Sequence, residues 1–335
     1  MGWKGTLRSL SVMQRQSERE ALKKQRELDK QRKLFEKMQE LERSSYEVQV
    51  YENDIDVLIS IHKDCGENWN WKLLQAIDPP IKPTKSNANE RLAQSNLEAY
   101  KPSLIDKILK RIEIKRNELI VVVEENKRKD EQAYQEALEE YEKIYSEWKA
   151  IRELAIRILS GDIAAFTDAI LQADPFSEIN QIGSAINFEV NEDYLVEAIL
   201  HVNSQDVIPN ETKTLLKSGK LSVKKMTKTK FYELYQDYVC GAVLRVAREL
   251  FALLPVNMVI VTAQGELLNT KTGHLEEQPI VSVAIPKETL NRLNFDMLDP
   301  SDSMDNFLHK MKFLKTKGFQ KVDKILVSAL NSSQQ

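Results

Sequence analysis

Two runs of lysine form the clearest pattern of residue types with a chemical role in this sequence. Between Glu211 and Glu233 there are seven lysines and no acidic residue, and a second run extends from Lys310 to Lys324. Segregated lysines can follow the phosphate backbone of a nucleic acid, or they can keep a strand edge solvated and unpaired. Both interpretations stay open, and the lysines considered for polyanion binding are Lys217, Lys220, Lys224, Lys225, Lys228, Lys230, Lys310, Lys312 and Lys315.

Signatures of catalysis are absent or incomplete. The sequence contains no Gly-x-Gly-x-x-Gly, no P-loop, no Gly-x-Ser-x-Gly and no His-Glu-x-x-His, so nucleotide cofactors and the common hydrolase sites have no support. His62 and Cys65 are one helical turn apart, but a structural zinc site needs four ligands. We therefore predict no cofactor and no metal, we assign no catalytic residue, and a protein that is not an enzyme is favoured.

Two acidic patterns keep a hydrolase open as an alternative. One is a trio of aspartates spaced by three, which can present carboxylates to Mg²⁺ or can simply stabilise the start of a helix through its dipole. The other places a histidine beside two glutamates in an expected hairpin loop, where acid–base chemistry needs such groups. The residues are Asp299, Asp302 and Asp305 in the first pattern, and His274, Glu276 and Glu277 in the second.

Composition limits the possible classes of protein. Hydrophobic residues make up 42% of the 335 residues, charged residues make up 30%, and the formal net charge is −3. Two cysteines, Cys65 and Cys240, do not make a disulfide framework and favour a reducing compartment. The longest apolar run, Leu119–Val123, is far shorter than the roughly 20 residues of a membrane span. We expect a cytoplasmic protein whose partners do not include a membrane.

The elements that position these residues begin with a long helix. From Thr6 to Cys65 there is no glycine or proline, and good helix formers dominate. Apolar residues recur at helical spacing, which is typical of a coiled-coil seam: Leu34, Met38, Leu41, Val48, Ile55 and Ile59. The stretch from Met1 to Arg43 carries 12 basic and seven acidic residues, which fits either a solvated helix or an arm for an anionic partner.

A second long helix is expected from Ser103 to Ser160, after a proline-rich connection at 66–89. Two helices of nearly equal length predict an antiparallel coiled-coil hairpin covering residues 1–160. Folding the chain at its prolines pairs 48–61 with 107–120, but it leaves an aromatic stripe poorly matched. That stripe is expected to meet the following domain or a partner, and its central residues are Tyr141, Tyr145, Trp148 and Ile151.

Residues 161–335 predict a compact α+β domain. Strands are expected at 185–190 and 194–202, and a further hairpin turns at Ser218-Gly219. Thr229–Leu254 has the wide apolar face of a helix packed on a sheet. Runs rich in β-branched residues at 256–263 and 280–285 are typical of central strands. The order of the elements favours an α+β domain with an antiparallel or mixed sheet.

These patterns favour a structural or interaction protein, with a coiled-coil arm and an α+β binding domain, acting within a larger assembly. Its partner is expected to be another protein or a second copy of the chain, bound through the coiled coil. The first alternative is a nucleic-acid-associated factor that uses the two lysine runs. The second alternative is a metal-dependent hydrolase.

Overall fold

The computed structural model describes residues 40–103, 108–177, 184–190, 195–202 and 207–327. Their contacts divide into two compact units. The helical unit contains Lys72–Ala155, and the sheet unit combines the described part of Ser9–Trp71 with the described residues from Ile156 onward. The protein is therefore a mixture of helix and sheet, with one very long helix and one mixed sheet.

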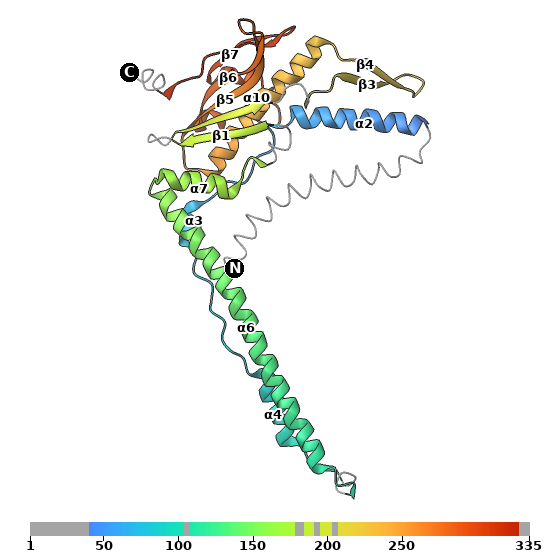
Figure 1. Cartoon of the computed structure of the whole chain (residues 1–335), viewed down its shortest axis with the longest axis vertical. Coiled ribbons are helices and arrows are strands. Elements are labelled where there is room, and N and C mark those ends of the chain that lie inside the picture. Colours follow the sequence, from blue (N-terminus) through green and yellow to red (C-terminus); the bar gives the residue numbers. More distant parts are fainter. Residues whose placement is uncertain (1–39, 104–107, 178–183, 191–194, 203–206, 328–335) are drawn as a thin grey trace. The chain divides into compact units, whose positions relative to one another are not determined.

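The helical unit is built on α6 (Ile112–Leu159), a helix of 48 residues, most of which lies in this unit. It also contains α4 (Ala88–Ala99) and nearly all of α3 (Trp71–Ala76). The absence of glycine and proline between residues 103 and 160 allows α6 to continue without a break. In Figure 1, α4 and the chain before it run alongside α6.

The chain that packs along α6 is mostly extended. Trp148 Nε1 donates to the carbonyl of Ile77 at 2.9 Å, and Arg152 Nε donates to the carbonyl of Gln75 at 3.2 Å. Further along, Lys85 pairs with Glu131. The segment thus runs antiparallel to α6. Its prolines favour an extended chain that rises about 3.1 Å per residue, roughly twice the rise of a helix, so a short segment covers a long part of α6.

A carboxylate on α6 caps the first turn of α4. Asp130 Oδ2 accepts from the backbone N–H of Glu90 at 2.8 Å, and Oδ1 accepts from Asn89 Nδ2 at 2.7 Å. Asn87, at the N-cap position, makes no side-chain capping bond. The hydrogen bond from the Glu90 backbone is the main reason why the pKa of Asp130 is lowered. One of the open N–H groups in the first turn of α4, that of Glu90, is therefore satisfied by a neighbouring helix.

The expected helical hairpin is not found among the described residues. α2 (Glu40–Ile59) belongs to the sheet unit and packs on α10 (Lys228–Leu253), β3 (Glu211–Leu215) and β4 (Leu221–Lys225). The predicted pairing of 48–61 with 107–120 is therefore not shown, and α2 packs on elements of its own unit, because an apolar stripe can pack on any complementary apolar surface. Residues 1–39 of the expected first helix, including Leu34 and Met38, lie outside the described residues.

The sheet unit is built on a five-stranded sheet in the order β1-β2-β5-β6-β7. β2 and β5 are parallel, and the other neighbouring strands are antiparallel, so the sheet is mixed as the sequence predicted. The strands are β1 (Ser184–Val190), β2 (Val196–Val202), β5 (Met258–Asn269), β6 (His274–Pro286) and β7 (Leu308–Met311). Two short pairs, β3-β4 and β8 (Phe313–Leu314) with β9 (Gly318–Phe319), lie outside this sheet.

Helix α10 forms the centre of the core, as its wide apolar face predicted (Figure 1). Thr227 caps its start, since Thr227 Oγ1 accepts from the backbone N–H of Lys230. Its packing residues include Tyr238, Val243, Leu244 and Leu250, all fully buried. α10 contacts β2 and β5, and it also links these parallel strands along the chain.

Both faces of the central strands are covered. Ile260 of β5 and Ala284 of β6 pack with Leu195 and Ile325 in a separate buried cluster. The backbone N–H of Ile325 donates to Ser282 Oγ at 3.0 Å, which ties the segment around Ile325 to β6. The remaining helices are α7 (Ile163–Ala173), α11 (Lys287–Leu290) and the 3₁₀ turn η1 (Asp302–Asn306).

Candidate functional site

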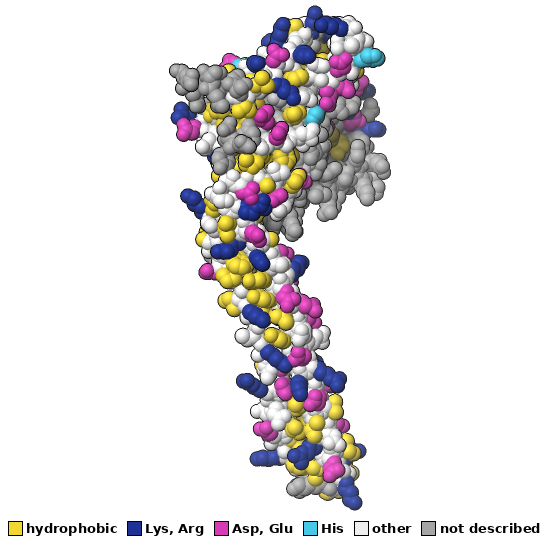
Figure 2. All heavy atoms as spheres, turned by 60° about the vertical axis from the view of Figure 1, so that its left-hand side comes forward, with side chains coloured by type: hydrophobic (Ala, Val, Ile, Leu, Met, Phe, Trp, Pro, Cys, Tyr) yellow, Lys and Arg dark blue, Asp and Glu magenta, His cyan; other side chains and the backbone are white. Residues whose placement is uncertain are grey.

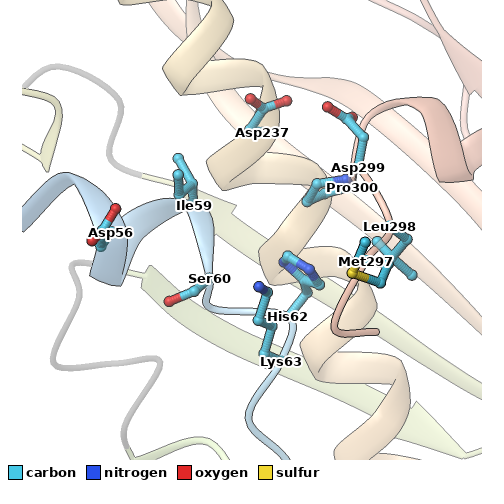
Figure 3. Close-up of a pocket in the computed structure, with 10 residues that line it drawn as sticks. All are labelled: Asp56, Ile59, Ser60, His62, Lys63, Asp237, Met297, Leu298, Asp299 and Pro300. Carbon is cyan, nitrogen blue, oxygen red and sulfur yellow. The ribbon is translucent and has the colours of Figure 1, made fainter. Parts of the chain in front are cut away.

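The sheet unit has an open hollow of about 600 Å³ (Figure 3). Its walls come from the C-terminal end of α2 with the turn that follows, from α10, and from the segment that precedes η1. Three carboxylates, one lysine and one histidine line it together with apolar side chains. The lining residues are Asp56, Ile59, Ser60, His62, Lys63, Asp237, Met297, Leu298, Asp299 and Pro300.

An arginine on α10 fixes the turn that carries His62. Arg248 Nη1 donates to the backbone carbonyls of His62, Lys63 and Asp64. Its guanidinium also lies over the ring of Phe295, with Cζ 4.1 Å from the ring centroid. The guanidinium thus satisfies three carbonyls in the turn that follows α2. Arg248 thus holds two walls of the hollow against α10.

Asp237 and Asp299 form the acidic end of the hollow, where their carboxylates are neighbours (Figure 3). Burial of Asp237, followed by the nearby charge of Asp299, raises the pKa of Asp237 to about 6, and a hydrogen bond with Ser301 opposes this shift. Asp299 Oδ1 accepts from the backbone N–H groups of Ser301 and Asp302 at 2.9 and 3.0 Å. Asp299 therefore has a structural role at the start of η1 and also faces the hollow.

His62 lies in the wall of the hollow and is only 1% exposed. Neither ring nitrogen has a hydrogen-bond partner. Burial lowers the pKa of His62, and the charges of Lys63 and Arg248 lower it further. Backbone groups of Phe295 and Ile59 oppose this lowering in part, but they do not meet hydrogen-bond geometry. A neutral imidazole in this wall keeps one donor and one acceptor unpaired.

The fold brings part of the second lysine run against the start of α10. Lys315 Nζ lies 3.8 Å from Glu233 Oε1, and the ring of Phe319 lies 5.3 Å from the ring of Tyr235. Lys228 and Lys230, in the first turn of α10, are exposed. The ten residues from Lys310 to Phe319 thus approach the end of the first lysine run.

Other lysines of the two runs lie apart from this point. Lys217 and Lys220 flank the turn at the far end of the β3-β4 hairpin, while Lys224 and Lys225 are on β4 near α10. Lys310 is on β7, and its Nζ donates to the carbonyl of Lys324 at 3.4 Å; Lys312 lies between β7 and β8. The side chains of all nine candidate lysines are exposed.

The aromatic stripe follows the face of α6 in the helical unit. Tyr141 stacks on Tyr145, with ring centroids 5.7 Å apart, and Tyr145 contacts Trp148 at 5.3 Å. Trp148 is hydrogen-bonded to Ile77, so the proline-rich chain lies beside this part of the stripe. Ile151 is half-buried, whereas Tyr145 is 39% exposed. The stripe's role in docking a domain or a partner stays a prediction.

Cys65 is one of the two residues considered for zinc. Burial, reinforced by the Glu249 charge, raises the pKa of its thiol to about 11.

The groups considered for hydrolase chemistry are not brought together. Glu276 accepts from Asn269, Thr272 and Gln278 within the β5-β6 hairpin, and Glu277 contacts His201 instead of His274. Asp302 and Asp305 are exposed on η1. Among the described residues, no three carboxylate, histidine or cysteine side chains form a group able to hold a metal ion.

Sequence reasoning did not select Asp237 or the apolar tip of the helical unit. Asp237 lies next to the apolar face of α10, and its pairing with Asp299 depends on a loop about 60 residues later.

At the tip of the helical unit, six large apolar side chains are exposed, and yellow side chains gather at the lower end of Figure 2. They are Ile108, Leu109, Ile114, Ile120, Val121 and Val122, called the tip surface below.

Comparison with known proteins gives no relative: no family model, no curated protein and no solved structure matches this chain. Within the part of the chain that the structure describes, no helix combines the length and the apolar character that crossing a bilayer requires.

Proposed function

We propose that this chain is an interaction protein that works within a larger assembly, with the helical unit as an arm and the α+β unit as a binding domain. The observation that carries this proposal is the tip surface. Ile108 is 80% exposed, Ile114 is 58% exposed and Val121 is 55% exposed. Large exposed apolar patches mark contact surfaces on proteins.

The local sequence supports this interpretation of the tip surface. Valine and isoleucine are weaker helix formers than alanine or leucine, because branching at Cβ restricts their rotamers. Yet residues 120–123 place four such residues in succession on α6, and three of them are exposed. A solvated helix gains nothing from this composition, whereas a helix that pairs with a protein partner gains buried apolar area. We therefore propose another protein, or a second copy of this chain, as the partner.

The test compares two double variants that each replace two exposed apolar residues. Ile114→Asp with Val121→Asp alters the tip surface, and Leu268→Asp with Leu275→Asp alters an exposed pair on the β5-β6 hairpin. A photo-crosslinking residue at Val122 reports the contact, and light scattering reports the mass in solution. We expect cross-links and any oligomer to be lost only in the tip variant. A chain that stays monomeric and forms no cross-link from the tip in its native lysate contradicts the proposal.

A second candidate function is contact with nucleic acid through the lysine runs. The observation in its favour is the approach of the Lys310–Phe319 segment to the start of α10, where Lys315 lies 3.8 Å from Glu233. The first turn of α10 contains no acidic residue and carries Lys228 and Lys230. Lysines at the positive end of a helix oppose its dipole, so an anion bound there would relieve this repulsion.

Binding of a single-stranded oligonucleotide tests this second candidate. Charge-driven binding weakens steeply as salt rises, in proportion to the number of phosphates contacted. Lys228→Glu with Lys230→Glu, in the first turn of α10, is expected to reduce affinity and to flatten the salt dependence. Lys271→Glu, an exposed site in the β5-β6 turn, serves as the control. Binding that is absent, or that does not depend on salt, rules the candidate out.

A further inference from the structure

The β3-β4 hairpin is a two-stranded ribbon that stands apart from the five-stranded sheet. α2 packs against it, and Figure 1 shows it extending past the start of α10. At its turn, the backbone N–H of Gly219 donates to the carbonyl of Leu216 at 2.8 Å, and the N–H of Leu216 donates to the carbonyl of Lys220 at 2.9 Å. Gly219 has a φ of 80°, as a three-residue hairpin turn requires. The turn therefore fixes the pairing of the two strands up to the end of the hairpin.

The two faces of the hairpin differ, because side chains alternate along each strand and directly paired residues share a face. One face meets α2: Lys213 Nζ lies 3.3 Å from Glu47 Oε2, and Val223 is the cross-strand partner of Lys213. The even-numbered residues form the opposite face, called the outer face below, which is turned away from α2. Its cross-strand pairs are Thr212 with Lys224, Thr214 with Ser222, and Leu216 with Lys220.

The outer face carries hydrogen-bond donors and no carboxylate. It has two ammonium groups and three hydroxyls, and only Leu216 is apolar. Both lysines and Thr214 are exposed to solvent. No acidic residue occurs between Glu211 and Glu233, and Glu211 itself lies on the α2 side. Lysines and hydroxyls are side chains that donate to the phosphate oxygens and to the base edges of nucleic acids.

The dimensions of the hairpin suit one groove of DNA. Its strands lie about 4.8 Å apart, and the four steps from Thr212 to Leu216 rise about 14 Å. The major groove of B-DNA is about 12 Å wide and admits a two-stranded ribbon, whereas the major groove of duplex RNA is too deep and narrow for side chains to read. Duplex DNA is therefore favoured over duplex RNA as the partner of the outer face.

A protein partner fits the outer face less well. Protein interfaces are centred on buried aromatic and apolar side chains, and lysine is depleted in them. The outer face has no aromatic residue, and Leu216, which is 51% exposed, is its only large apolar side chain. The exposed side chains of Leu215 and Val223 lie on the α2 side and do not belong to the outer face. The chemistry of the outer face is therefore that of a surface for a polyanion.

We propose that the outer face of the β3-β4 hairpin enters the major groove of duplex DNA, where Lys220 and Lys224 contact phosphates and the hydroxyls of Thr214 and Ser222 donate to phosphates or base edges. The inference rests on the second candidate function and deepens it, since it names the element that binds and the form of nucleic acid that is bound. It does not involve the tip surface, because the hairpin belongs to the sheet unit.

The experiment measures fluorescence polarisation of the full chain with a short labelled DNA duplex, at several salt concentrations. Lys220→Gln with Lys224→Gln should lower affinity by about tenfold or more and should reduce the slope of log affinity against log salt by about 1.8, since each phosphate contact contributes about 0.9. The matched control is Lys271→Gln with Arg292→Gln, which removes the same charge at two exposed sites outside the hairpin and should bind as the parent does.

A second variant tests the hydroxyls without any change of charge. Thr214→Val with Ser222→Ala should lower affinity about three- to tenfold, the size expected from losing a hydrogen bond, and should leave the salt slope unchanged because no charge is removed. Circular dichroism confirms that the variants keep the fold of the parent. The inference is overturned if either hairpin variant binds as the parent does, or if the control loses as much affinity as Lys220→Gln with Lys224→Gln.

Other ligands test the groove and the class of partner. We expect weaker binding to duplex RNA, to the single strand, and to a DNA duplex whose bases carry a bulky sugar at C5, because that position faces the major groove. Equal binding to any of these three overturns the inference, as does displacement by poly-glutamate as effective as that by unlabelled duplex. Salt-dependent binding to the single strand, with no preference for the duplex, leaves the second candidate function standing. Absence of binding to every nucleic acid overturns both.

Discussion

Glu249 Oε1 accepts a hydrogen bond from the backbone N–H of Gly66 at 3.0 Å, across 183 positions of the sequence. The same carboxylate oxygen lies 2.7 Å from Arg245 Nε, and both charged side chains are almost fully buried. This contact joins the chain after α2 to α10. Together with Arg248, it holds α2 on the sheet unit, where the sequence alone had placed it in a coiled coil.

Removal of the Glu249 carboxylate is expected to be strongly destabilising. Glu249→Ala removes the carboxylate that pairs with buried Arg245 at 2.7 Å and the acceptor of the Gly66 N–H, and breaking a buried pair costs about 3–5 kcal/mol. Chemical unfolding followed by circular dichroism measures the loss. Glu288→Ala, at an exposed acid on α11, is the control. A loss below about 1 kcal/mol, the size of a surface ion pair, would contradict this account.

Asp237 should make stability depend on pH in an unusual direction. Because its pKa in the folded chain, about 6, lies above the ordinary value of 3.8, the folded state holds this proton more tightly. Its contribution to stability is therefore complete below about pH 4 and is lost as pH rises through 6. Asp237→Asn is expected to gain about 1 kcal/mol at pH 7, a figure reduced for partial solvent screening, and nothing at pH 4. Unfolding curves at both pH values measure the gain, and equal effects at pH 4 and 7 would exclude the mechanism.

Alanine substitutions at two glycines distinguish the cost of backbone strain from the cost of a steric clash. Gly318 and Gly273 have nearly equal positive φ, 73° and 74°, but an added Cβ at Gly318 meets the ring of Tyr232 at 2.7 Å and at Gly273 meets nothing within 4 Å. Gly273→Ala should cost about 1–2 kcal/mol from strain alone, and Gly318→Ala should cost about 1–3 kcal/mol more. Thermal unfolding compares the two variants, and equal costs would show that the Tyr232 contact yields freely.

Capping of α4 by Asp130 can be tested through amide exchange. Asp130→Ala removes the acceptor for the Glu90 N–H, so the amides of the first turn of α4 should lose protection several-fold. Protection should fall in the parent as well when pH drops below the ordinary carboxyl range, because the pKa of Asp130 is lowered and its ionised form makes the cap. Glu139→Ala, exposed on α6, is the control. Unchanged exchange at Glu90 and Arg91 would mean that the cap is not needed.

The sequence determined the elements whose patterns are local. The break-free stretch from 103 to 160 predicted most of α6, and the wide apolar face of 229–254 predicted α10. The β-branched runs predicted the first half of β5 and the second half of β6. These predictions succeeded because helix and strand periodicity follow from the direction of side chains along one segment. The β3-β4 hairpin followed from its turn residues, Ser218 and Gly219, for the same reason.

Tertiary structure alone decided which surfaces meet. An apolar stripe specifies that α2 must be covered, but it does not specify whether α6 or α10 covers it, and the buried contacts of Gly66 and Arg248 favour α10. The prolines at 79–83 favour an extended chain, and this chain became the partner of α6. An extended chain covers a given length of helix with about half as many residues as a second helix would need. The hollow likewise depends on residues from three distant segments, His62, Asp237 and Asp299, whose proximity no local pattern encodes.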